Sequence, residues 1–325
     1  MAGLVAAARA RELGVSVRVL EKGDRPGGSM LLSSGVVWRY REFDELRRQC
    51  PGGNAALQRL VWERLDDALG WLEGLGAPVV ARDTERPFTT GRRFDAHRLT
   101  DALVRAAGEI TYRDGAPAGG LLAPPIVVAT GGYSVSLARE RGLLVRSNPW
   151  SEGDGIELAL ARGAEEAPSD EFYGRAMPGP VPEERFVAAS QLYGRFARRV
   201  NDLGEEFFPG EPSWSENDLV QAIAAQPGAR AWYELDPAAL VRPEVAARLP
   251  YAHDTEPLSG GGLRVRVYAA VTHTYGGVKI DDRARAADGI WVAGVDAGGI
   301  STGGYASGLA QALVLGLVAA ESAAQ

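Results

Sequence analysis

The chain has 325 residues, which is long for one domain and comfortable for two, because ordinary domains contain roughly 100–200 residues. Hydrophobic residues make up 46% and charged residues 24%, so enough apolar surface exists to build a core and disorder is excluded. The net charge of −7 argues against a nucleic-acid partner held by phosphate contacts. A single cysteine, Cys50, excludes an internal disulfide framework and a zinc–cysteine cluster, and we expect no metal.

We expect no membrane partner, because no stretch reaches the roughly 18 consecutive apolar residues that a membrane span needs. The apolar run at the N-terminus is interrupted by Arg9, Arg11 and Glu12, which a secretory signal would not tolerate. These observations predict a cytoplasmic protein.

The first half of the chain alternates helical and strand-like segments. An Ala- and Leu-rich helix is predicted over 2–13 and ends at Gly14, and a β-branched strand over 15–20 runs into Glu21. A glycine-bearing loop follows. Further helices are predicted over 42–49, 55–75, 94–107 and 154–162, and a second buried strand over 126–129.

The middle of the chain changes character at a proline-rich segment, 177–184, and again at the glycine run 259–262. Between them we expect a strand over 196–201, a helix over 217–225, a strand over 232–235 and a helix over 237–249. Strands over 265–269 and 290–293 and a long helix from near Tyr305 then return to the first pattern. The order predicts an α/β dinucleotide-binding domain, 1–176 and 263–325, with an inserted α+β capping domain, 177–262, that closes over hinges near 178–182 and 260–262.

The N-terminal segment has the order of a dinucleotide-binding βαβ unit, in which an acidic residue after the second strand binds the ribose hydroxyls. Glu21 stands eighteen positions after Gly3, which would be the last glycine of the G-x-G-x-x-G turn. The first strand and the first two glycines are absent, so we expect an N-terminally truncated chain. The same residues are also compatible with an Ala-rich surface helix followed by any buried strand.

Four further segments favour the nucleotide interpretation: EKGDRPGGS (21–29), VVATGGYS (127–134), EGDGIELAL (152–160) and the C-terminal pair THTYGGVKID with IWVAGVDAGGISTGGYASGLAQALVLG. In this order and spacing they resemble the FAD-dependent fumarate reductase and succinate dehydrogenase flavoprotein family, whose relatives include 3-ketosteroid dehydrogenases and tricarballylate dehydrogenase. The resemblance implies a Rossmann-like FAD-binding domain, with the first strand missing, and a capping domain.

The resemblance assigns the cofactor residues one by one. Glu21 would bind the adenosine ribose, and Thr130 and Gly131 would close over the adenosine end. The pyrophosphate and the flavin would be lined by Gly27, Gly28 and Ser29. Further cofactor-binding candidates are Gly3, Lys22, Ser34, Gly35, Gly276 and Gly277. No histidine follows the glycine pair between Met30 and Gly35, so the implied FAD is non-covalent.

At the flavin end, the resemblance places Asp154 near the flavin side of the cofactor and Asp296 against the ribityl chain. Ser307, Gly308 and Leu309 would present a helix N-terminus to the flavin N1–C2 carbonyl. That placement is physically sensible, because reduced flavin carries negative charge there and a helix N-terminus stabilises an anion.

The substrate side departs from the family pattern. His273 matches a family histidine that binds a substrate carboxylate or carbonyl oxygen. The arginine that donates a proton in fumarate-reducing members aligns with Glu216, and a substrate-clamping arginine aligns with Ser301. A T-E-x-x-R element of the family is replaced by ASQLY, 189–193. Because these carboxylate-binding arginines are missing, fumarate and succinate are not the expected substrates.

The remaining candidates are aromatic and hydroxylic. Tyr193 is the predicted proton-transfer residue, as tyrosines are in related ketosteroid dehydrogenases, and His273 and Ser301 complete the predicted catalytic set. The implied reaction transfers a hydride between flavin N5 and a carbon adjacent to a carbonyl-activated carbon. The substrate would be a small molecule with a carbonyl or carboxyl group, lying between the flavin and the cap, and the electron donor or acceptor is left open.

One alternative stays open: a flavin-fold protein, or a truncated gene product, that binds cofactor or ligand without turnover. Both the absent arginine and the absent first strand favour it. A chain without that strand is predicted to hold FAD weakly and to aggregate through exposed sheet edges.

Overall fold

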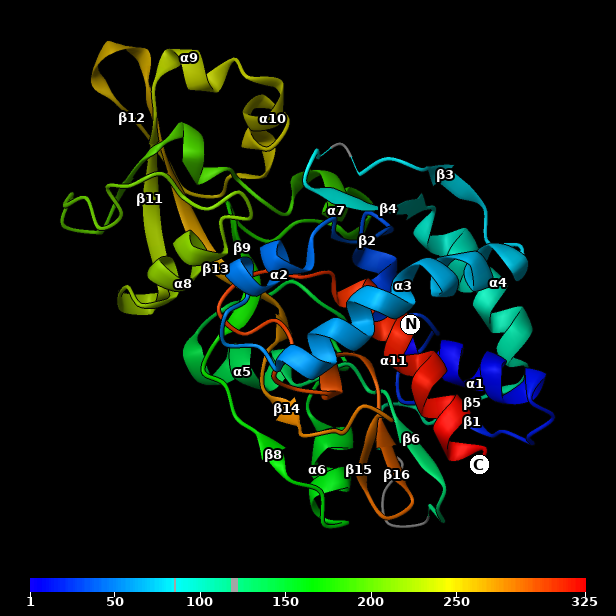
Figure 1. Ribbon diagram of the computed structural model, residues 1–325. Coiled ribbons are helices and arrows are strands. Elements are labelled where there is room, and N and C mark those ends of the chain that lie inside the picture. The colour runs from blue at the N-terminus through cyan, green and yellow to red at the C-terminus, as the bar shows by residue number, and fades with distance from the viewer. Residues whose placement is uncertain (85, 118–121) are drawn as a thin grey trace. The chain divides into compact units, whose positions relative to one another are not determined.

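The computed structural model describes residues 1–84, 86–117 and 122–325, which form two compact units (Figure 1). Unit 1 contains residues 1–133, 148–171 and 273–325, and unit 2 contains residues 134–147 and 172–272. The chain therefore passes between the units at 133/134, 147/148, 171/172 and 272/273. The predicted hinge segments 178–182 and 260–262 both lie inside unit 2, so the hinge prediction is wrong: neither segment connects the units.

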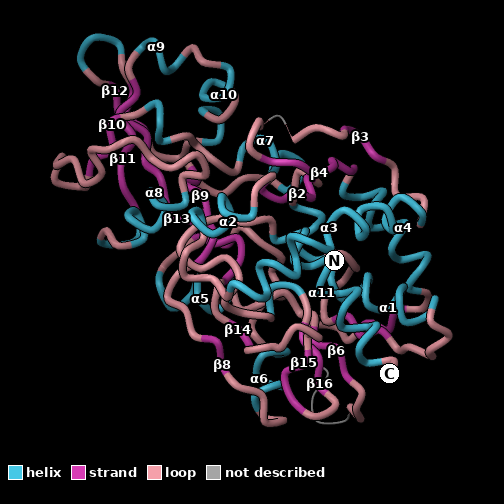
Figure 2. Tube along the Cα trace, viewed as in Figure 1, coloured by secondary structure: helices cyan, strands magenta, loops and turns pink. Residues whose placement is uncertain are grey.

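Unit 1 is a mixed helix and sheet unit whose strands are short (Figure 2). Its helices are α1 (Ala2–Glu12), α2 (Phe43–Gln49), α3 (Ala55–Gly74), α4 (Ala96–Ala107), α6 (Asp154–Leu160) and α11 (Gly308–Ala323). Its strands are β1 (Val19–Glu21), β2 (Val36–Tyr40), β3 (Val79–Ala81), β4 (Thr89–Phe94), β5 (Ile110–Tyr112), β6 (Ile126–Val128), β8 (Glu166–Ala167), β14 (Gly277–Val278), β15 (Arg285–Ala287) and β16 (Ile290–Val292).

Two parallel pairs carry the Rossmann-like character of unit 1. Strand β1 pairs with β5, with Val19 opposite Ile110, and β6 pairs with β16, with Ile126 opposite Ile290. The strands β2, β4 and β3 form a separate antiparallel sheet, which the sequence did not predict. The predicted α/β fold class with a Rossmann-like domain and an inserted second domain is confirmed.

Helices pack over these strands through apolar faces. α1 lies beside α11, and both contribute buried residues to the main core of unit 1 (Figures 1 and 2). Gly316 permits this approach, because a Cβ there would lie 2.8 Å from the Ala2 carbonyl oxygen. The predicted helix over 94–107 begins later, at Ala96, because Phe94 ends β4 and the Asp95 carboxylate caps the helix by accepting from the Arg98 N–H at 2.9 Å.

Unit 2 is built on an antiparallel sheet in the order β10, β11, β13, β12, to which β9 and the parallel strand β7 are added along β13. Its strands are β7 (Leu144–Val145), β9 (Phe172–Met177), β10 (Arg198–Val200), β11 (Arg230–Leu235), β12 (Thr255–Pro257) and β13 (Leu263–Thr274), whose last two residues belong to unit 1. Its helices are α5 (Ser134–Arg141), α7 (Phe186–Ala189), α8 (Asn217–Ala224), α9 (Pro237–Leu240) and α10 (Pro243–Ala246).

Two sequence predictions for unit 2 need correction. The helix predicted over 237–249 is divided into α9 and α10, because Arg242, the residue before Pro243, is extended, as residues before proline tend to be. The inserted unit also begins at 172 and ends at 272, and it takes in 134–147. The reason is that β13 is one continuous strand, which pairs with β7 and β9 as well as β11.

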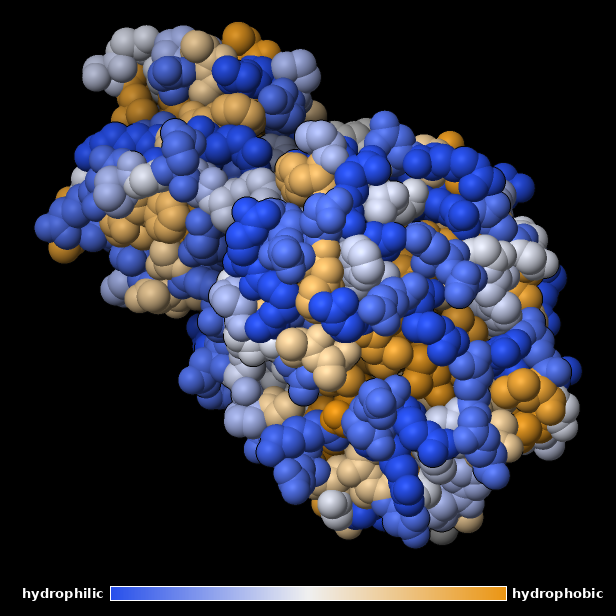
Figure 3. Space-filling model, viewed as in Figure 1, coloured by the Kyte–Doolittle hydropathy of each residue, from blue (hydrophilic) through white to orange (hydrophobic). Residues whose placement is uncertain are grey.

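Hydrophilic residues cover most of the face of the molecule shown in Figure 3. In the described part of the chain, no helix combines the length and apolarity required to cross a bilayer. Within the same residues, no group of three or more acidic, histidine or cysteine side chains is placed to hold a metal ion.

Candidate cofactor and active site

The predicted cofactor residues of unit 1 gather at the carboxyl ends of its parallel strands. Glu21 is the last residue of β1, Thr130 follows β6 by two residues, and Asp296 lies in a 3₁₀ turn (Gly294–Asp296) just after β16. In open α/β sheets, ligands bind outside the carboxyl ends of the strands. The carboxyl ends of these two parallel pairs are therefore the candidate binding edge of unit 1.

Asp296 joins the loops that follow β6 and β16. Its side chain is 0% exposed. Its Oδ1 accepts from Thr130 Oγ1 at 2.8 Å and from the Gly132 N–H at 3.1 Å, while Oδ2 accepts from the Gly131 N–H at 2.9 Å and from the Thr130 N–H. Burial raises the pKa of this carboxyl, and the four hydrogen bonds oppose that shift. The carboxylate thus fixes the turn of the ATGG motif, while its contact with a ribityl chain stays a prediction.

Glu21 and Lys22 lie at the carboxyl end of β1, in the other parallel pair. The Glu21 Oε1 accepts from the Gly23 N–H at 2.7 Å. The Lys22 ammonium donates to Glu152 Oε2 at 2.5 Å and to Asp154 Oδ2 at 2.7 Å. The structure therefore brings Asp154 beside the residue that follows Glu21, at the end predicted to bind adenosine. The predicted contact of Asp154 with the flavin side of the cofactor is not among these interactions and stays a prediction.

A cradle of small residues lies between these two ends. Gly27 and Gly28 have φ of 108° and 55°, backbone conformations that favour glycine. The Ser29 Oγ accepts from the Asn148 N–H at 2.9 Å. The backbone of Gly131 also has a positive φ, and a Cβ there would lie 3.1 Å from the Ser151 Oγ. That hydroxyl is buried and has no hydrogen-bond partner among the described residues. An orphaned buried hydroxyl beside glycine turns fits a phosphate-bearing dinucleotide.

Other predicted cofactor glycines lie at close backbone approaches. A Cβ on Gly35 would lie 1.9 Å from the Phe94 carbonyl oxygen, and one on Gly277 would lie 2.3 Å from the Asp296 carbonyl oxygen. A Cβ on Gly276 would lie 2.5 Å from the Tyr133 hydroxyl oxygen, whereas one on Gly3 would make only an ordinary contact, 3.4 Å, with Ala129 Cβ. Gly35, Gly276 and Gly277 therefore have a packing reason for glycine, whatever their contact with a cofactor. Ser34 is exposed.

The N-terminus of α11 lies under a histidine. Ser307 caps the helix by accepting from the Ala310 N–H at 3.2 Å, and Leu309 is in the first turn. A Cβ on Gly308 would lie 3.3 Å from His273 Cε1, so the imidazole covers this helix end. Burial lowers the pKa of His273 to about 4, although the side chain keeps some exposure. The imidazole is therefore neutral at pH 7, and it lies against the helix N-terminus that is predicted to face the flavin.

Ser301 belongs to a tight loop in the same unit. It is 3% exposed, and its Oγ has no hydrogen-bond partner within the part of the chain that the structure describes. The loop is held by Glu171, whose Oε2 accepts from the Gly303 N–H at 2.7 Å, and by the Tyr275 hydroxyl, which donates to the Gly304 carbonyl oxygen. The loop is thus fixed, with one hydroxyl unused.

Tyr193 and Glu216 lie in unit 2. The guanidiniums of Arg248 and Arg195 lie over the Tyr193 ring, 4.8 and 5.4 Å from its centroid. Glu216 is 2% exposed and accepts from the Gly194 N–H at 3.1 Å and from Arg195 Nε at 2.7 Å. Glu216 therefore anchors the segment that carries Tyr193, and its carboxylate is occupied by these donors.

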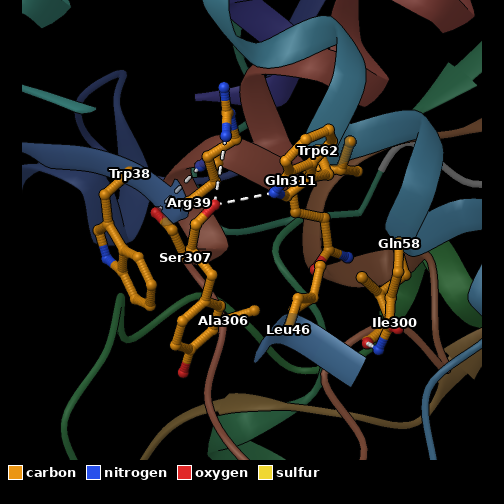
Figure 4. A pocket seen from close by; sticks show the side chains of 12 residues that line it. Trp38, Arg39, Leu46, Gln58, Trp62, Ile300, Ala306, Ser307 and Gln311 are labelled. Carbon is orange, nitrogen blue, oxygen red and sulfur yellow. Dashed lines mark hydrogen bonds between the residues drawn. The ribbon is translucent and has the colours of Figure 1, made fainter. Parts of the chain in front are cut away.

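A small cavity in unit 1 lies between β2, α3 and α11 (Figure 4). Its polar side chains turn toward protein partners: Trp62 Nε1 donates to the Tyr40 carbonyl oxygen and Gln58 Nε2 to the Ile300 carbonyl oxygen, both at 2.8 Å. The cavity has a volume of about 20 Å³, and roughly 10–15 Å³ is needed to hold one water molecule. It is too small to hold a substrate.

The loop 148–154 was not predicted from the sequence as a unit. Only its GDG end was singled out, yet Asn148, Trp150, Ser151 and Glu152 all contact or approach predicted cofactor residues. The available signal was position: the loop directly precedes the GDG helix, α6, and carries a tryptophan between polar residues.

Comparison with known proteins agrees with this geometry. The NAD(P)-binding Rossmann-like domain model matches residues 1–35. The probable fumarate reductase Ifc3 of Shewanella frigidimarina (strain NCIMB 400) is 24% identical over 343 aligned positions, which cover 85% of this chain and 57% of that protein. The chain thus spans little more than half of that relative.

Solved structures with the same fold include both a fumarate reductase and ketosteroid dehydrogenases. An open flavocytochrome c3 fumarate reductase has a TM-score of 0.76 at 20% identity, covering 99% of this chain and 76% of its own. The 3-ketosteroid-Δ4-(5α)-dehydrogenase of Rhodococcus jostii RHA1 has a TM-score of 0.73 at 17% identity, covering 100% and 95%. The Δ1-dehydrogenase of Sterolibacterium denitrificans also has a TM-score of 0.73, at 16% identity, covering 99% and 97%.

The fold is therefore the one that a flavocytochrome c3 fumarate reductase shares with 3-ketosteroid dehydrogenases. The resemblance to fumarate reductase flavoproteins and 3-ketosteroid dehydrogenases, predicted from the sequence motifs, is confirmed.

Proposed function

We propose that the chain is an oxidoreductase that binds FAD non-covalently and acts on a carbon–carbon bond next to a carbonyl group. The observation that carries this proposal is the buried Asp296 carboxylate, which joins the ATGG turn to the loop after β16 at the carboxyl edge of the parallel strands. Glu21 lies at the same type of edge on β1, and the α11 N-terminus lies under His273. These features match the ends and the middle of an extended dinucleotide.

Different residues would bind different parts of the cofactor. Glu21 accepts from the adenosine ribose, the backbone at Gly27–Ser29 and the Ser151 hydroxyl meet the phosphates, and the first turn of α11 faces the flavin N1–C2 carbonyl. FAD, when bound, supplies a hydride donor or acceptor at its N5 atom. The helix N-terminus favours the negative charge that reduction places at the end of the flavin facing it.

The chain's own residues would hold and polarise the substrate. A neutral His273 can donate a hydrogen bond to a carbonyl oxygen, and the unused Ser301 hydroxyl can add a second one. Tyr193 is the proposed proton-transfer residue. Glu216 takes the position of the family's proton-donating arginine, but it accepts hydrogen bonds from Gly194 and Arg195, so we assign it no proton transfer. We expect a saturated or unsaturated ketone or acid other than fumarate or succinate.

Anaerobic spectroscopy tests this function. Purified chain is loaded with FAD and mixed with a panel of saturated ketones and acids, and dithionite-reduced protein is mixed with the corresponding enones. Bleaching of the flavin band by a saturated compound, or its return with an enone, is expected, and His273→Ala should slow the reaction while FAD stays bound. Binding of FAD with no response to any carbonyl compound would instead support a protein that binds the cofactor without turnover.

A further inference from the structure

The strongest unassigned feature of the binding edge is Trp150, in the loop 148–154 that the cofactor prediction did not include. Its indole lies against two loops at once. A Cβ on Gly23 would lie 2.6 Å from Trp150 Cδ1 and 2.8 Å from Nε1, and a Cβ on Gly115 would lie 3.2 Å from Cζ3. Gly23 follows β1 and Gly115 follows β5, which are parallel partners. The indole therefore spans the carboxyl ends of both strands.

This place is the one where the adenosine end of a dinucleotide is expected. Glu21 ends β1, and its Oε1 lies 3.2 Å from the position of a Gly23 Cβ, the same position that the indole approaches. The Arg113 N–H donates to the Glu21 carbonyl oxygen and the Gly115 N–H to the Lys22 carbonyl oxygen, both at 2.8 Å. The two strand ends, the carboxylate and the indole thus form one continuous surface.

The loop that carries Trp150 is held in place from both sides. The Asn148 N–H donates to Ser29 Oγ at 2.9 Å, and Asn148 Oδ1 accepts from the Trp150 N–H at 3.2 Å. On the other side, Lys22 pairs with Glu152 and Asp154. A tryptophan fixed in this way loses little further conformational freedom when it stacks on a planar ligand.

Trp150 also keeps part of its surface accessible to solvent. A large aromatic side chain that is fixed, partly exposed and next to a ribose-binding carboxylate has the properties of a base-stacking platform, since every nucleobase offers a flat face.

We infer that Trp150 stacks on the adenine ring of the bound dinucleotide and that the loop 148–154 clamps the adenosine half of the cofactor. This inference rests on the proposed function and names a contact that the sequence motifs do not supply. It predicts that adenine nucleotides without a flavin bind the same surface.

The test uses ADP, which carries adenine, ribose and two phosphates, with FAD and FMN as companion probes. Isothermal titration measures the affinity for each in the wild-type chain and in Trp150→Leu, Trp150→Phe and the control Trp71→Phe. Trp150→Leu should weaken binding of ADP and of FAD by about tenfold, in the range measured for base–aromatic stacking. Trp150→Phe should restore most of the affinity, and Trp71→Phe and the binding of FMN should be unaffected.

Tryptophan fluorescence gives a second measurement, which remains possible even if the Trp150→Leu variant does not fold. ADP should quench the tryptophan fluorescence of the wild-type chain and of Trp71→Phe, and this quenching should be lost in Trp150→Phe. Unchanged or tighter ADP binding by Trp150→Leu, with FAD still bound, would overturn the stacking role alone. A wild-type chain that binds neither ADP nor FAD would overturn the proposed function together with it.

Discussion

Each unit buries one carboxylate of the predicted site, and the two carboxylates accept hydrogen bonds from different kinds of donor. Asp296 in unit 1 accepts from three backbone N–H groups and the Thr130 hydroxyl, with no cation in contact. Glu216 in unit 2 accepts from backbone N–H groups and also from the Arg195 guanidinium, whose side chain is 32% exposed. One carboxylate is held by dipoles alone, and the other by an ion pair that reaches solvent.

The difference teaches what each carboxylate can do. Neutral donors fix the geometry of a turn without cancelling the negative charge, so the Thr130–Gly132 turn is rigid and its remaining surface stays available for a ligand. The Glu216–Arg195 pair is compensated and anchors the Tyr193 segment. Both carboxylates therefore act as fixed hydrogen-bond acceptors.

Replacing Asp296 by Asn should have the largest effect, because the new amide N–H₂ would face backbone N–H donors in a buried site. We expect the free energy of unfolding to fall by about 3 kcal/mol. Urea unfolding followed by circular dichroism measures it. The matched control is Asp281→Asn, an exposed carboxylate that also accepts from two backbone N–H groups. Equal stability of Asp296→Asn and wild type would refute the clamp.

Replacing Glu216 by Gln should cost less, about 2 kcal/mol, because Arg195 can turn toward solvent when its partner is neutral. The same unfolding experiment measures it, with Glu256→Gln as an exposed ion-pair control. If the loss equals or exceeds that of Asp296→Asn, the contrast between the two carboxylates is wrong.

His273 gives a stability effect that is confined to a defined pH window. Its pKa is lowered to about 4 from 6.5, so the unfolded chain takes up the proton first as the pH falls. The stability tied to the neutral ring is present above pH 6.5 and is lost between pH 6.5 and about 4. The temperature of thermal unfolding should depend less on pH in His273→Asn than in the wild-type chain. His97→Asn, which removes an exposed histidine, is the control and should keep the pH dependence of the wild-type chain. Identical pH profiles for all three would contradict this.

The parts of the molecule that were predictable had local signals. The helix over Ala55–Gly74 was predicted within one residue because apolar residues recur on one face and Asn54 caps it. The strand ending at Glu21 and the C-terminal glycine motifs located the binding edge. The sheet of β2, β3 and β4 was missed because β4 contains Gly91 and two arginines, and such a strand has no alternating apolar pattern.

The site could be predicted only as far as motifs reach. Glu21 was predicted from its place at the end of a strand, and Thr130, Gly131 and Asp296 were predicted from the family resemblance; the structure places all four at or just after strand ends. The hydrogen-bond partners of Asp296 and Glu216 could not be predicted from the sequence, because those contacts join residues that are 166 and 22 positions apart in the chain. Trp150 was missed for the same reason: its neighbours Gly23 and Gly115 are brought to it by the pairing of β1 with β5.

We propose that the carboxyl end of β1 in unit 1 binds one FAD through Glu21, and an equilibrium titration of the purified chain followed by flavin fluorescence tests this most directly. We predict saturable binding of one FAD per chain. We also predict that Glu21→Gln weakens binding by about tenfold through loss of a charged hydrogen bond, while Asp24→Asn, an exposed neighbour, has no effect. The account is contradicted if no saturable binding occurs or if Glu21→Gln binds FAD as tightly as the wild-type chain.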